Sequence, residues 1–235
     1  MSDISIMRVD RLELGLAPRP WPFALENRDA IDRHFAQLKR TKPAVWNGRI
    51  LLLCEHSIAD AVFRGRYFET DYASFLAWRA WGFPDPAVRN CFSLGALRGR
   101  DGGFLLGAMG AHTVNAGTIY FPAGTPEPED IVGEAVDLAG NIWREVEEET
   151  GLGRDAYEAQ QGWYSVLDGQ RIAQVKILQA RDTAAALRER IMAHLARQRE
   201  PELADIRIVR GAADFDPMMP QFVTAFLRHI WSHAP

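Results

Sequence analysis

The chain has 235 residues, 47% of them hydrophobic, so it can bury a substantial core as one large domain or as one domain with an extension. Its 27 basic and 31 acidic residues give a formal charge of −4, which argues against a nucleic-acid polymer as partner because no basic excess is available to hold a phosphate backbone. No apolar run approaches the ~20 residues of a membrane span, and the first residues include acids without a long apolar core, so we expect a soluble cytoplasmic protein.

The first half of the chain is predicted to combine strands with two helices. Apolar and polar residues alternate over 6–16, which indicates one strand, and three prolines follow it. Ile31, Phe35 and Leu38 recur at helical spacing and predict a helix over 28–42. The elements expected next are a turn and strand within 46–57, a strand at 59–72 and a short aromatic helix at 73–82.

The second half is predicted to place helices between hairpins. Segments 91–99 and 104–110 flank an Asp-Gly-Gly turn and should form a hairpin. The glycines and prolines of 114–130 predict an extended, irregular segment. The elements expected after it are a long helix at 133–150, a hairpin over 162–180, a charged helix at 183–198, a strand at 205–210 and an amphipathic helix at 220–231. This mixture predicts an α/β or α+β protein.

The two cysteines, Cys54 and Cys91, have apolar neighbours typical of strands. Both are therefore predicted to be buried thiols in a reducing compartment, and a disulfide between them is the less favoured alternative.

Carboxylates are concentrated in "REVEEETGL", residues 144–152. On a helix, Glu145, Glu148 and Glu149 share one face, while apolar residues gather on the other. Like charges at this spacing destabilise a helix, and acids near its C-terminal end oppose the macrodipole. A hard divalent cation would offset that repulsion, because Mg²⁺ and Mn²⁺ prefer oxygen ligands. The alternative is a solvated acidic helix surface, which is what most charge runs are.

The same stretch resembles the second half of the signature of the Nudix hydrolases, R-E-U-x-E-E-x-G-U with U aliphatic. The positions that match are Arg144, Glu145, Val146, Glu148, Glu149, Gly151 and Leu152. The first half departs from the pattern, with Val136 where the family has Glu and Asp130 where it has Gly. If Gly124 of "FPAG" is the family's glycine, this half is six residues longer than the pattern. The candidates to replace the missing glutamate are Asp137, Glu134 and Glu129.

The resemblance covers about residues 92–210 and implies a Nudix α/β/α sandwich with a mixed sheet over 91–235. Residues 1–90 lie outside it and are predicted from their own pattern to form an N-terminal β/α extension. It implies cleavage of the pyrophosphate bond of a small-molecule nucleoside diphosphate derivative, with Mg²⁺ or Mn²⁺ as cofactor. By position, Glu145, Glu148 and Glu149 would be the metal ligands, and Arg144 would orient Glu145 or Glu148. The general base would come from the motif or from a later loop, where Glu202 is preferred to Glu200.

The N-terminal region is expected to carry substrate specificity. "WNG" at 46–48 and "FPAGTPEPED" are more weakly similar to Nudix relatives that act on UDP-sugars, which favours a nucleotide sugar. Tyr72 and Gly124 are the predicted substrate-binding residues, and aromatic faces suit nucleobases. The nearby aromatic residues Phe75, Trp78 and Trp81 could also stack on a base, but residues of this kind are more often buried in the core. His112 and Asn115 could reach a phosphate or have only structural roles.

Two other functions remain open from the sequence. The missing first-half glutamate is compatible with a module that binds or senses a nucleotide without turnover, although such a module would not need all three ligand carboxylates. An enzyme for oxidised nucleoside triphosphates is less favoured because the N-terminal region would then have no evident task. The sequence does not specify the assembly, for which a homodimer is one option.

Overall fold

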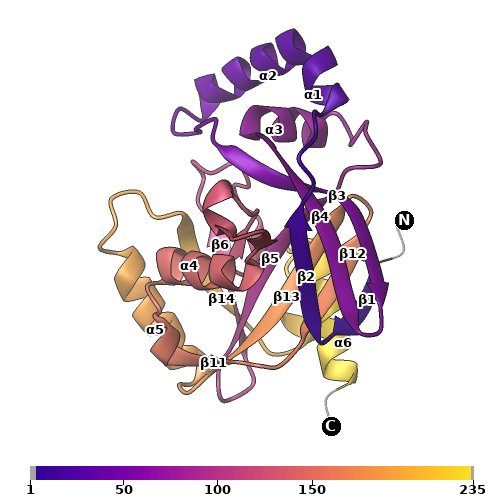
Figure 1. The fold of residues 1–235 in the computed structure, drawn as a ribbon. Helices are drawn as coiled ribbons and strands as arrows, with labels where there is room; N and C mark the ends of the chain where they lie inside the picture. Colours follow the sequence, from indigo (N-terminus) through magenta and orange to yellow (C-terminus); the bar gives the residue numbers. More distant parts are fainter. Residues whose placement is uncertain (1–3, 234–235) are drawn as a thin grey trace.

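Two sheets form the centre of the computed structural model, which describes residues 4–233 (Figure 1). The larger sheet has the order β1-β12-β13-β5-β6-β14, and β7, β8 and β11 pair with its members. Its strands are β1 (Ser5–Val9), β5 (Asn90–Arg98), β6 (Phe104–Met109), β7 (Ile119–Tyr120), β8 (Ala123–Gly124), β11 (Tyr157–Ala159), β12 (Trp163–Asp168), β13 (Arg171–Ala180) and β14 (Leu203–Val209). It is mixed, because β13 runs parallel to β5 while the other pairs are antiparallel.

The smaller sheet has the order β3-β4-β2-β10-β9. Its strands are β2 (Arg11–Leu16), β3 (Arg49–Ala59), β4 (Val62–Asp71), β9 (Ile131–Val132) and β10 (Ala135–Val136). A tight turn at Asp60 and Ala61, both with positive φ, joins β3 to β4. The apolar inner faces of the two sheets share one core, which includes Leu53, Phe63 and Ile172. The strands predicted within 46–57 and 59–72 are therefore confirmed.

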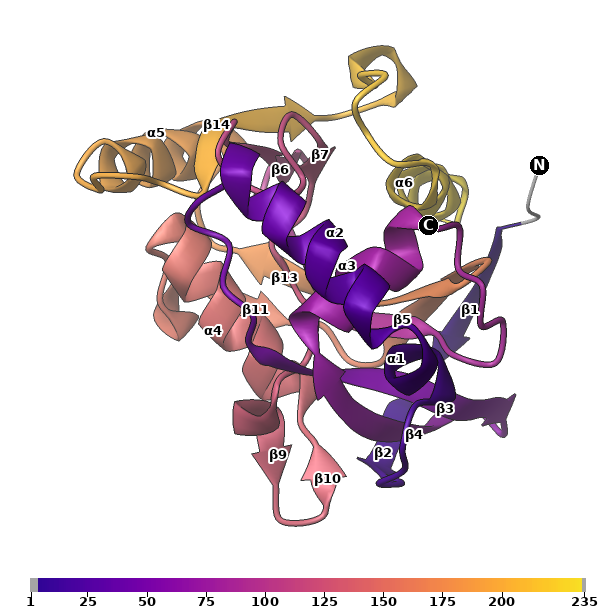
Figure 2. The same cartoon turned by 90° about the horizontal axis from the view of Figure 1, so that it is seen from above.

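The helices cover both sheets in layers. They are α1 (Pro22–Glu26), α2 (Arg28–Thr41), α3 (Tyr72–Ala80), α4 (Leu138–Thr150), α5 (Ala184–Leu195) and α6 (Gln221–Ser232), with short 3-10 helices at η1 (Pro128–Asp130), η2 (Arg154–Ala156) and η3 (Ala212–Asp214). Figures 1 and 2 show α4 and α5 together on one side of the larger sheet, α6 on its other side, and α1 to α3 over the smaller sheet. Three separate apolar clusters fill these layers. The predicted α/β class, with helices on both faces of a mixed sheet, is confirmed.

The strand predicted over 6–16 is two strands in two sheets. β1 pairs with β12 of the larger sheet, whereas β2 runs beside β4 in the smaller one. The change occurs at Asp10, whose N–H donates to the carbonyl of Ala61 at 2.6 Å and draws the chain toward the smaller sheet. Since β9 and β10 in turn join the smaller sheet, the two sheets exchange strands across residue 90. The division into 1–90 and 91–235 stays a prediction.

The helix predicted over 133–150 begins later, at Leu138. Gly133 has φ +64° and lies in the turn between β9 and β10, and Val136, expected on the helix, is a buried residue of β10. Asp137 caps the helix by accepting hydrogen bonds from the N–H groups of Ala139 and Gly140. An acid just before an apolar periodic run is a helix-start signal, so the true boundary was present in the sequence.

The turn predicted at 100–103 is present, but the hairpin around it is short. β5 and β6 are paired only at Arg98 and Phe104, after which they diverge, with β8 pairing to β5 and β7 to β6. The segment 114–130, expected to be irregular, supplies these two short strands and η1. Through β8, Gly124 pairs with Ser93 of β5 and lies against Asn141 and Glu145 of α4.

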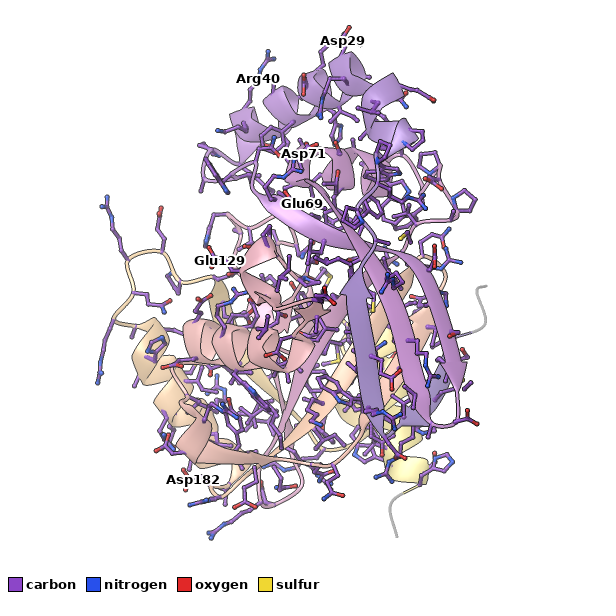
Figure 3. The ribbon with its side chains drawn as sticks, in the orientation of Figure 1. Asp29, Arg40, Glu69, Asp71, Glu129 and Asp182 are labelled. Atoms are coloured by element: carbon purple, nitrogen blue, oxygen red, sulfur yellow. The ribbon has the colours of Figure 1, made fainter. Side chains whose placement is uncertain are left out.

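The remaining predicted elements are present with small changes in length. α2, α3, α5, α6, β14 and the hairpin of β12 and β13 fall within the predicted ranges or one to three residues of them. α3 begins at a cap made by Asp71, which accepts a hydrogen bond from the Ser74 N–H at 3.0 Å (Figure 3). Cys91 is buried as predicted, whereas Cys54 is only partly buried, and both thiols are free. Among residues 4–233, no helix has the length and apolar character needed to cross a membrane.

Candidate active site

The acidic helix α4 is held by its apolar face and by both of its ends. Leu138, Ile142 and Val146 are buried in the core beneath it. Gly95 of β5 has no side chain where the methyl groups of Val146 and Ile142 lie, so the helix can approach the sheet closely. At the other end, Gly151 has φ +68° and its N–H donates to the carbonyl of Glu147 at 2.8 Å. The predicted helix end is confirmed, and the acidic turn directly precedes it.

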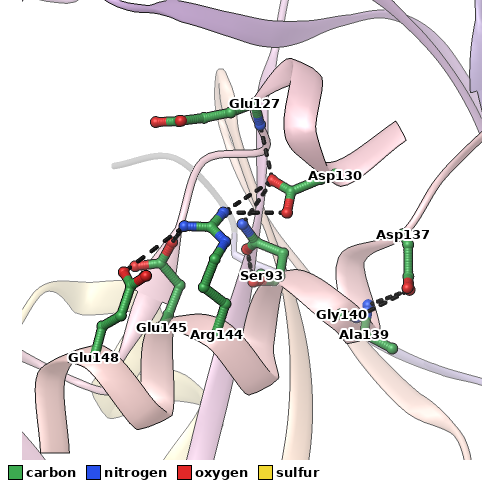
Figure 4. A network of polar contacts seen from close by, with 10 residues as sticks. Ser93, Glu127, Asp130, Asp137, Ala139, Gly140, Arg144, Glu145 and Glu148 are labelled. Carbon is green, nitrogen blue, oxygen red and sulfur yellow. Dashed lines mark hydrogen bonds and ion pairs between the residues drawn. The ribbon is translucent and has the colours of Figure 1, made fainter. Parts of the chain in front are cut away.

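A buried carboxylate, Asp130 of η1, fixes the arginine of the motif. The Nη2 atom of Arg144 lies 3.1 and 3.2 Å from the two oxygens of Asp130 (Figure 4). Asp130 also accepts hydrogen bonds from the Asn141 amide at 2.9 Å and from the Glu127 N–H at 2.8 Å. Ser93 of β5 donates to the amide oxygen of Asn141. This network anchors the guanidinium group to η1 and to the larger sheet.

Asp130 was missed as a functional residue because it appeared only as a mismatch to the family's glycine. The three candidates for the missing glutamate lie elsewhere. Asp137 is used as the cap of α4, Glu134 lies in the turn between β9 and β10, and Glu129 is exposed on η1 (Figure 3). In the part of the chain that is described, the carboxylate partners of Arg144 are Asp130 and the glutamates of α4.

Arg144 contacts the first two glutamates of the α4 face, as expected. Its Nη1 atom lies 2.9 Å from Glu145 and 3.8 Å from Glu148. The Glu148 side chain is 63% exposed, whereas Glu149 is only 7% exposed and accepts a hydrogen bond from the Ala123 N–H. The three carboxylates therefore extend from the interior to the surface along one side of the helix.

Gly124 lies directly against these carboxylates. A Cβ atom at this position would come within 2.6 Å of the Glu145 Oε1 atom and 2.5 Å of the Asn141 amide oxygen. Any side chain would therefore displace Glu145 or Asn141. The position requires glycine because of close packing, and its predicted contact with substrate stays a prediction.

The carboxylates of this region repel one another. The pKa of Glu145 is raised to about 8, first by burial and then by the charges of Glu148 and Glu202, although Arg144 opposes the shift. Burial also raises the pKa of Glu149 well above its ordinary value, with added repulsion from Glu202 and Glu145. Glu202, in the chain just before β14, therefore adds its charge to that of the motif glutamates. Their repulsion is the condition that a bound cation would relieve.

The donor set fits a hard divalent cation by its chemistry. It consists of carboxylate oxygens, which Mg²⁺ and Mn²⁺ prefer, and the negative charge is incompletely balanced by Arg144. In the conformation shown, no group of three His, Cys, Asp or Glu side chains within residues 4–233 is arranged to enclose an ion. Because Glu145 and Glu148 are turned toward Arg144, ligation would require these flexible side chains to change rotamer.

A cavity of about 330 Å³ contains several of the other predicted residues. Tyr72 and Glu202, which are far apart in the sequence, both line it. Its lining also includes Trp46, His112, Asn115 and Glu200. Burial raises the pKa of Glu202, whereas His112 lowers it. Glu202, which lines this cavity, also adds to the charge that raises the pKa of Glu145 and Glu149.

The other aromatic residues of α3 have structural positions. Phe75 and Trp78 are buried in the core between α1 to α3 and the smaller sheet, as the more common interpretation expected. Trp81 is partly exposed and packs on Phe23 and His34. Arg79, which was not predicted, donates to the Asn115 side chain at 3.1 Å, and Asn115 donates to the Tyr120 hydroxyl at 3.1 Å. This chain of contacts supports the wall of the cavity.

A larger hollow of about 920 Å³ lies on the smaller sheet, away from the α4 carboxylates. Glu13 binds both Arg11 and Arg64 at 2.9 Å.

Among known proteins, similarity to this chain is found only with solved structures. No family model matches the chain, and no curated protein matches it significantly. The chain is similar to a solved Nudix hydrolase, RenU, from M. smegmatis, with 16% identity and a TM-score of 0.37 over 62% of this chain and 86% of that one. It is also similar to a bifunctional NMN adenylyltransferase/ADP ribose pyrophosphatase from Francisella tularensis, with 13% identity and a TM-score of 0.43 over 68% of this chain and 45% of that one.

A third similar structure is the MutT protein from Methanosarcina mazei Go1, with 16% identity and a TM-score of 0.32 over 60% of this chain and 94% of that one. All three resemblances are partial. The functional assignment below therefore rests on the residues of α4 and their surroundings.

Proposed function

We propose that the chain is a Nudix-type hydrolase that cleaves the pyrophosphate bond of a small-molecule nucleoside diphosphate derivative. One observation carries the proposal. The motif residues Arg144, Glu145, Glu148 and Glu149 lie on one side of α4, and Glu202 approaches them from the chain before β14. A helix with only a structural task has no reason to gather these repelling carboxylates beside a cavity.

The ligands of the proposed cofactor, Mg²⁺ or Mn²⁺, are Glu145, Glu148 and Glu149. When bound, the metal would neutralise phosphate charge and lower the pKa of a coordinated water. Arg144 keeps Glu145 and Glu148 in position, and Asp130 keeps Arg144 in position. Gly124 allows the β8 backbone to reach Glu145 without a steric clash. These residues hold the donor oxygens together on one side of α4.

Glu202 is the preferred general base. It lines the cavity and is close enough to influence Glu145 and Glu149, so a water between these groups could lose its proton to it. Glu145 is the alternative within the motif. Glu200 lines the same cavity, but it is not among the main causes of the raised pKa values of Glu145 and Glu149.

A nucleotide sugar is the preferred substrate class, on the basis of the weak resemblance of the WNG and FPAGTPEPED segments to UDP-sugar-cleaving relatives. Tyr72 supports this preference because it lies in the cavity, where an aromatic ring is available to a ligand. A cytoplasmic location and a homodimer stay predictions.

The test is a substrate panel of nucleotide sugars, dinucleotides, CoA esters and nucleoside triphosphates, with Mg²⁺ or Mn²⁺. Release of a nucleoside monophosphate from at least one diphosphate derivative, dependent on the metal, is expected. Glu148→Gln should abolish it, while Glu147→Gln, an exposed neighbour on the same helix, should not. The absence of turnover with folded protein across the panel would contradict the proposal.

A binding or sensing module is the second candidate. It is favoured by the first half of the motif, where Val136 stands in place of the family's Glu. Metal addition distinguishes the two. For the enzyme, Mg²⁺ or Mn²⁺ should raise the melting temperature, with about 2.7 kcal/mol of added stability at 100 times Kd. A module that binds nucleotides without metal would show the shift with nucleotide alone.

A further inference from the structure

Trp46 differs from every other tryptophan of the chain. Six of the seven tryptophans have an aromatic or cationic side chain against the ring. These are Trp21, Trp78, Trp81, Trp143, Trp163 and Trp231. Trp46 has no such partner among residues 4–233 and is 78% exposed. Its two faces are therefore available to stack on a planar group.

The segment around Trp46 is built to hold it in place. The Asn47 side-chain oxygen accepts a hydrogen bond from the Ala73 N–H at 2.8 Å, and the Gly48 carbonyl accepts one from the Tyr72 N–H at 2.9 Å. The segment is thereby fastened to the first turn of α3. A Cβ atom at Gly48 would lie 2.9 Å from the indole nitrogen, so only glycine leaves room for the ring. Asn47 and Gly48 have structural tasks, and Trp46 has none.

The ring lies at the cavity that Glu202, the proposed general base, also lines. Trp46 and Tyr72 line it from the N-terminal region, while His112 and Glu202 line it from the loop after β6 and the chain before β14. Lys42, at the end of α2, donates to the carbonyl of Thr113 and connects these two walls. The aromatic wall is therefore fixed relative to the carboxylates.

The chemistry of the cavity favours an uncharged, planar ligand group. Its acidic side chains are Glu200 and Glu202, which would repel a phosphate that has no cation beside it. Its volume of about 330 Å³ is at the lower end for small-molecule sites, enough for one part of a dinucleotide-sized substrate. An exposed indole face stacks on a nucleobase with little dependence on which base it is.

We propose that Trp46 is the platform on which the nucleobase of the substrate stacks, with Tyr72 forming the adjacent wall. The inference rests on the proposed function, because it takes the substrate to be a nucleoside diphosphate derivative. The base is bound in the cavity, and the diphosphate extends from it toward Glu145, Glu148 and Glu149. Trp46 determines affinity and takes no part in bond cleavage.

The test compares Trp46→Ala and Trp46→Phe with the wild type in steady-state hydrolysis of UDP-glucose or the best substrate found. Trp46→Ala should raise KM by about 5- to 150-fold, the range for loss of one stacked base, with kcat nearly unchanged. Trp46→Phe should recover most of the affinity. Leu25→Ala, which removes a side chain that is 67% exposed on α1, is the matched control and should leave KM unchanged. An unchanged KM in Trp46→Ala overturns the proposal.

Binding of product fragments separates the base from the sugar and does not depend on turnover. UMP should quench the part of the tryptophan fluorescence that Trp46→Phe removes, whereas glucose 1-phosphate should not. Quenching by glucose 1-phosphate alone would overturn the base assignment. If the wild type binds UMP through Trp46 but hydrolyses no diphosphate derivative, the hydrolase proposal fails while the base subsite stands.

Discussion

Helices α2 and α4 are similar in length but distribute their charges in opposite ways. α2 has Asp29 in its first turn and Lys39 and Arg40 in its last, which matches the helix macrodipole (Figure 3). α4 has no acid in its first turn and no base in its last, and its glutamates are concentrated toward its C-terminal end. α2 has the charges expected of a helix selected for stability. α4 retains unfavourable charges, and a ligand is what would make them favourable.

The two hollows of the surface differ in the same way. The larger one, on the smaller sheet, contains the ion pair of Glu13 with Arg64. The smaller one is lined by Glu202, whose charge adds to the repulsion that raises the pKa of Glu145 and Glu149. Uncompensated charge is therefore a better guide to chemistry here than the volume of a cavity.

The largest expected effect comes from the buried end of the carboxylate face. Glu149→Gln keeps the hydrogen bond from Ala123 but removes a proposed metal ligand, so hydrolysis should fall by at least about 100-fold. The free energy of unfolding should stay the same or rise, because glutamine has nearly the shape of glutamate and removes the cost of burying a carboxylate at this position. Activity assays and chemical denaturation measure the two effects. A variant that lost stability and activity together would show that Glu149 has a structural task and would weaken the contrast with α2.

Gly124→Ala tests the close approach of β8 to α4. The added Cβ atom would lie within 2.7 Å of Glu145 and Asn141, and overpacking of this kind costs about 1–3 kcal/mol. Activity should fall as well, because Glu145 would be displaced. Gly211→Ala is the matched control, since a Cβ atom there meets nothing within 4 Å and φ is −166°. Equal melting temperatures for the two variants would contradict the packing assignment.

Asp71→Asn tests the ion pair that joins α2 to α3. Burial raises the pKa of Asp71, but hydrogen bonds from Ser74 and Arg28 and the charge of Arg28 outweigh it and lower the pKa below 3.8. A lowered pKa means that the stabilisation is present above the ordinary value and is lost as pH falls through the folded value. The variant keeps a good helix cap, so it should lose about 1 kcal/mol at pH 7 and little at pH 3.

The control for this variant is Asp32→Asn, which removes an exposed carboxylate paired with the same guanidinium group at 2.9 Å. Its effect should be no more than a few tenths of a kcal/mol, because exposed ion pairs contribute little. Urea denaturation at both pH values measures the two. A loss for Asp71→Asn that does not depend on pH would contradict the assignment.

The smallest effects test the macrodipole contrast itself. Lys39→Glu should destabilise α2 by about 0.3–1 kcal/mol, because it places an acid at the helix C-terminal end. Glu147→Lys should stabilise α4 by a similar or smaller amount without changing activity, since Glu147 is exposed and outside the proposed ligand set. Both should fade in 1 M salt. The change in the free energy of unfolding should therefore be negative for Lys39→Glu and positive for Glu147→Lys. Changes of the same sign would contradict the macrodipole contrast.

Local patterns explain which predictions succeeded. The helical spacing of Ile31, Phe35 and Leu38 was sufficient for α2, and Gly151 was sufficient for the end of α4. The strand over 6–16 was wrong in one respect, because alternation reports burial on one face and not which sheet provides the partner. The start of α4 was placed too early because Val136 fits the apolar periodicity of the helix although it belongs to β10.

The sequence by itself determined the carboxylate cluster, its placement on one helix face and the glycine that ends it, because these depend on spacing within a few turns of chain. Only the tertiary structure brought Asp130 to Arg144, Glu202 to the α4 carboxylates and Trp46 and Tyr72 to the cavity beside them. These residues come from segments far apart in the chain, and their meeting depends on how β5, β8 and β14 are ordered in the sheet. Spacing along the sequence does not determine which distant segments are neighbours in the folded chain.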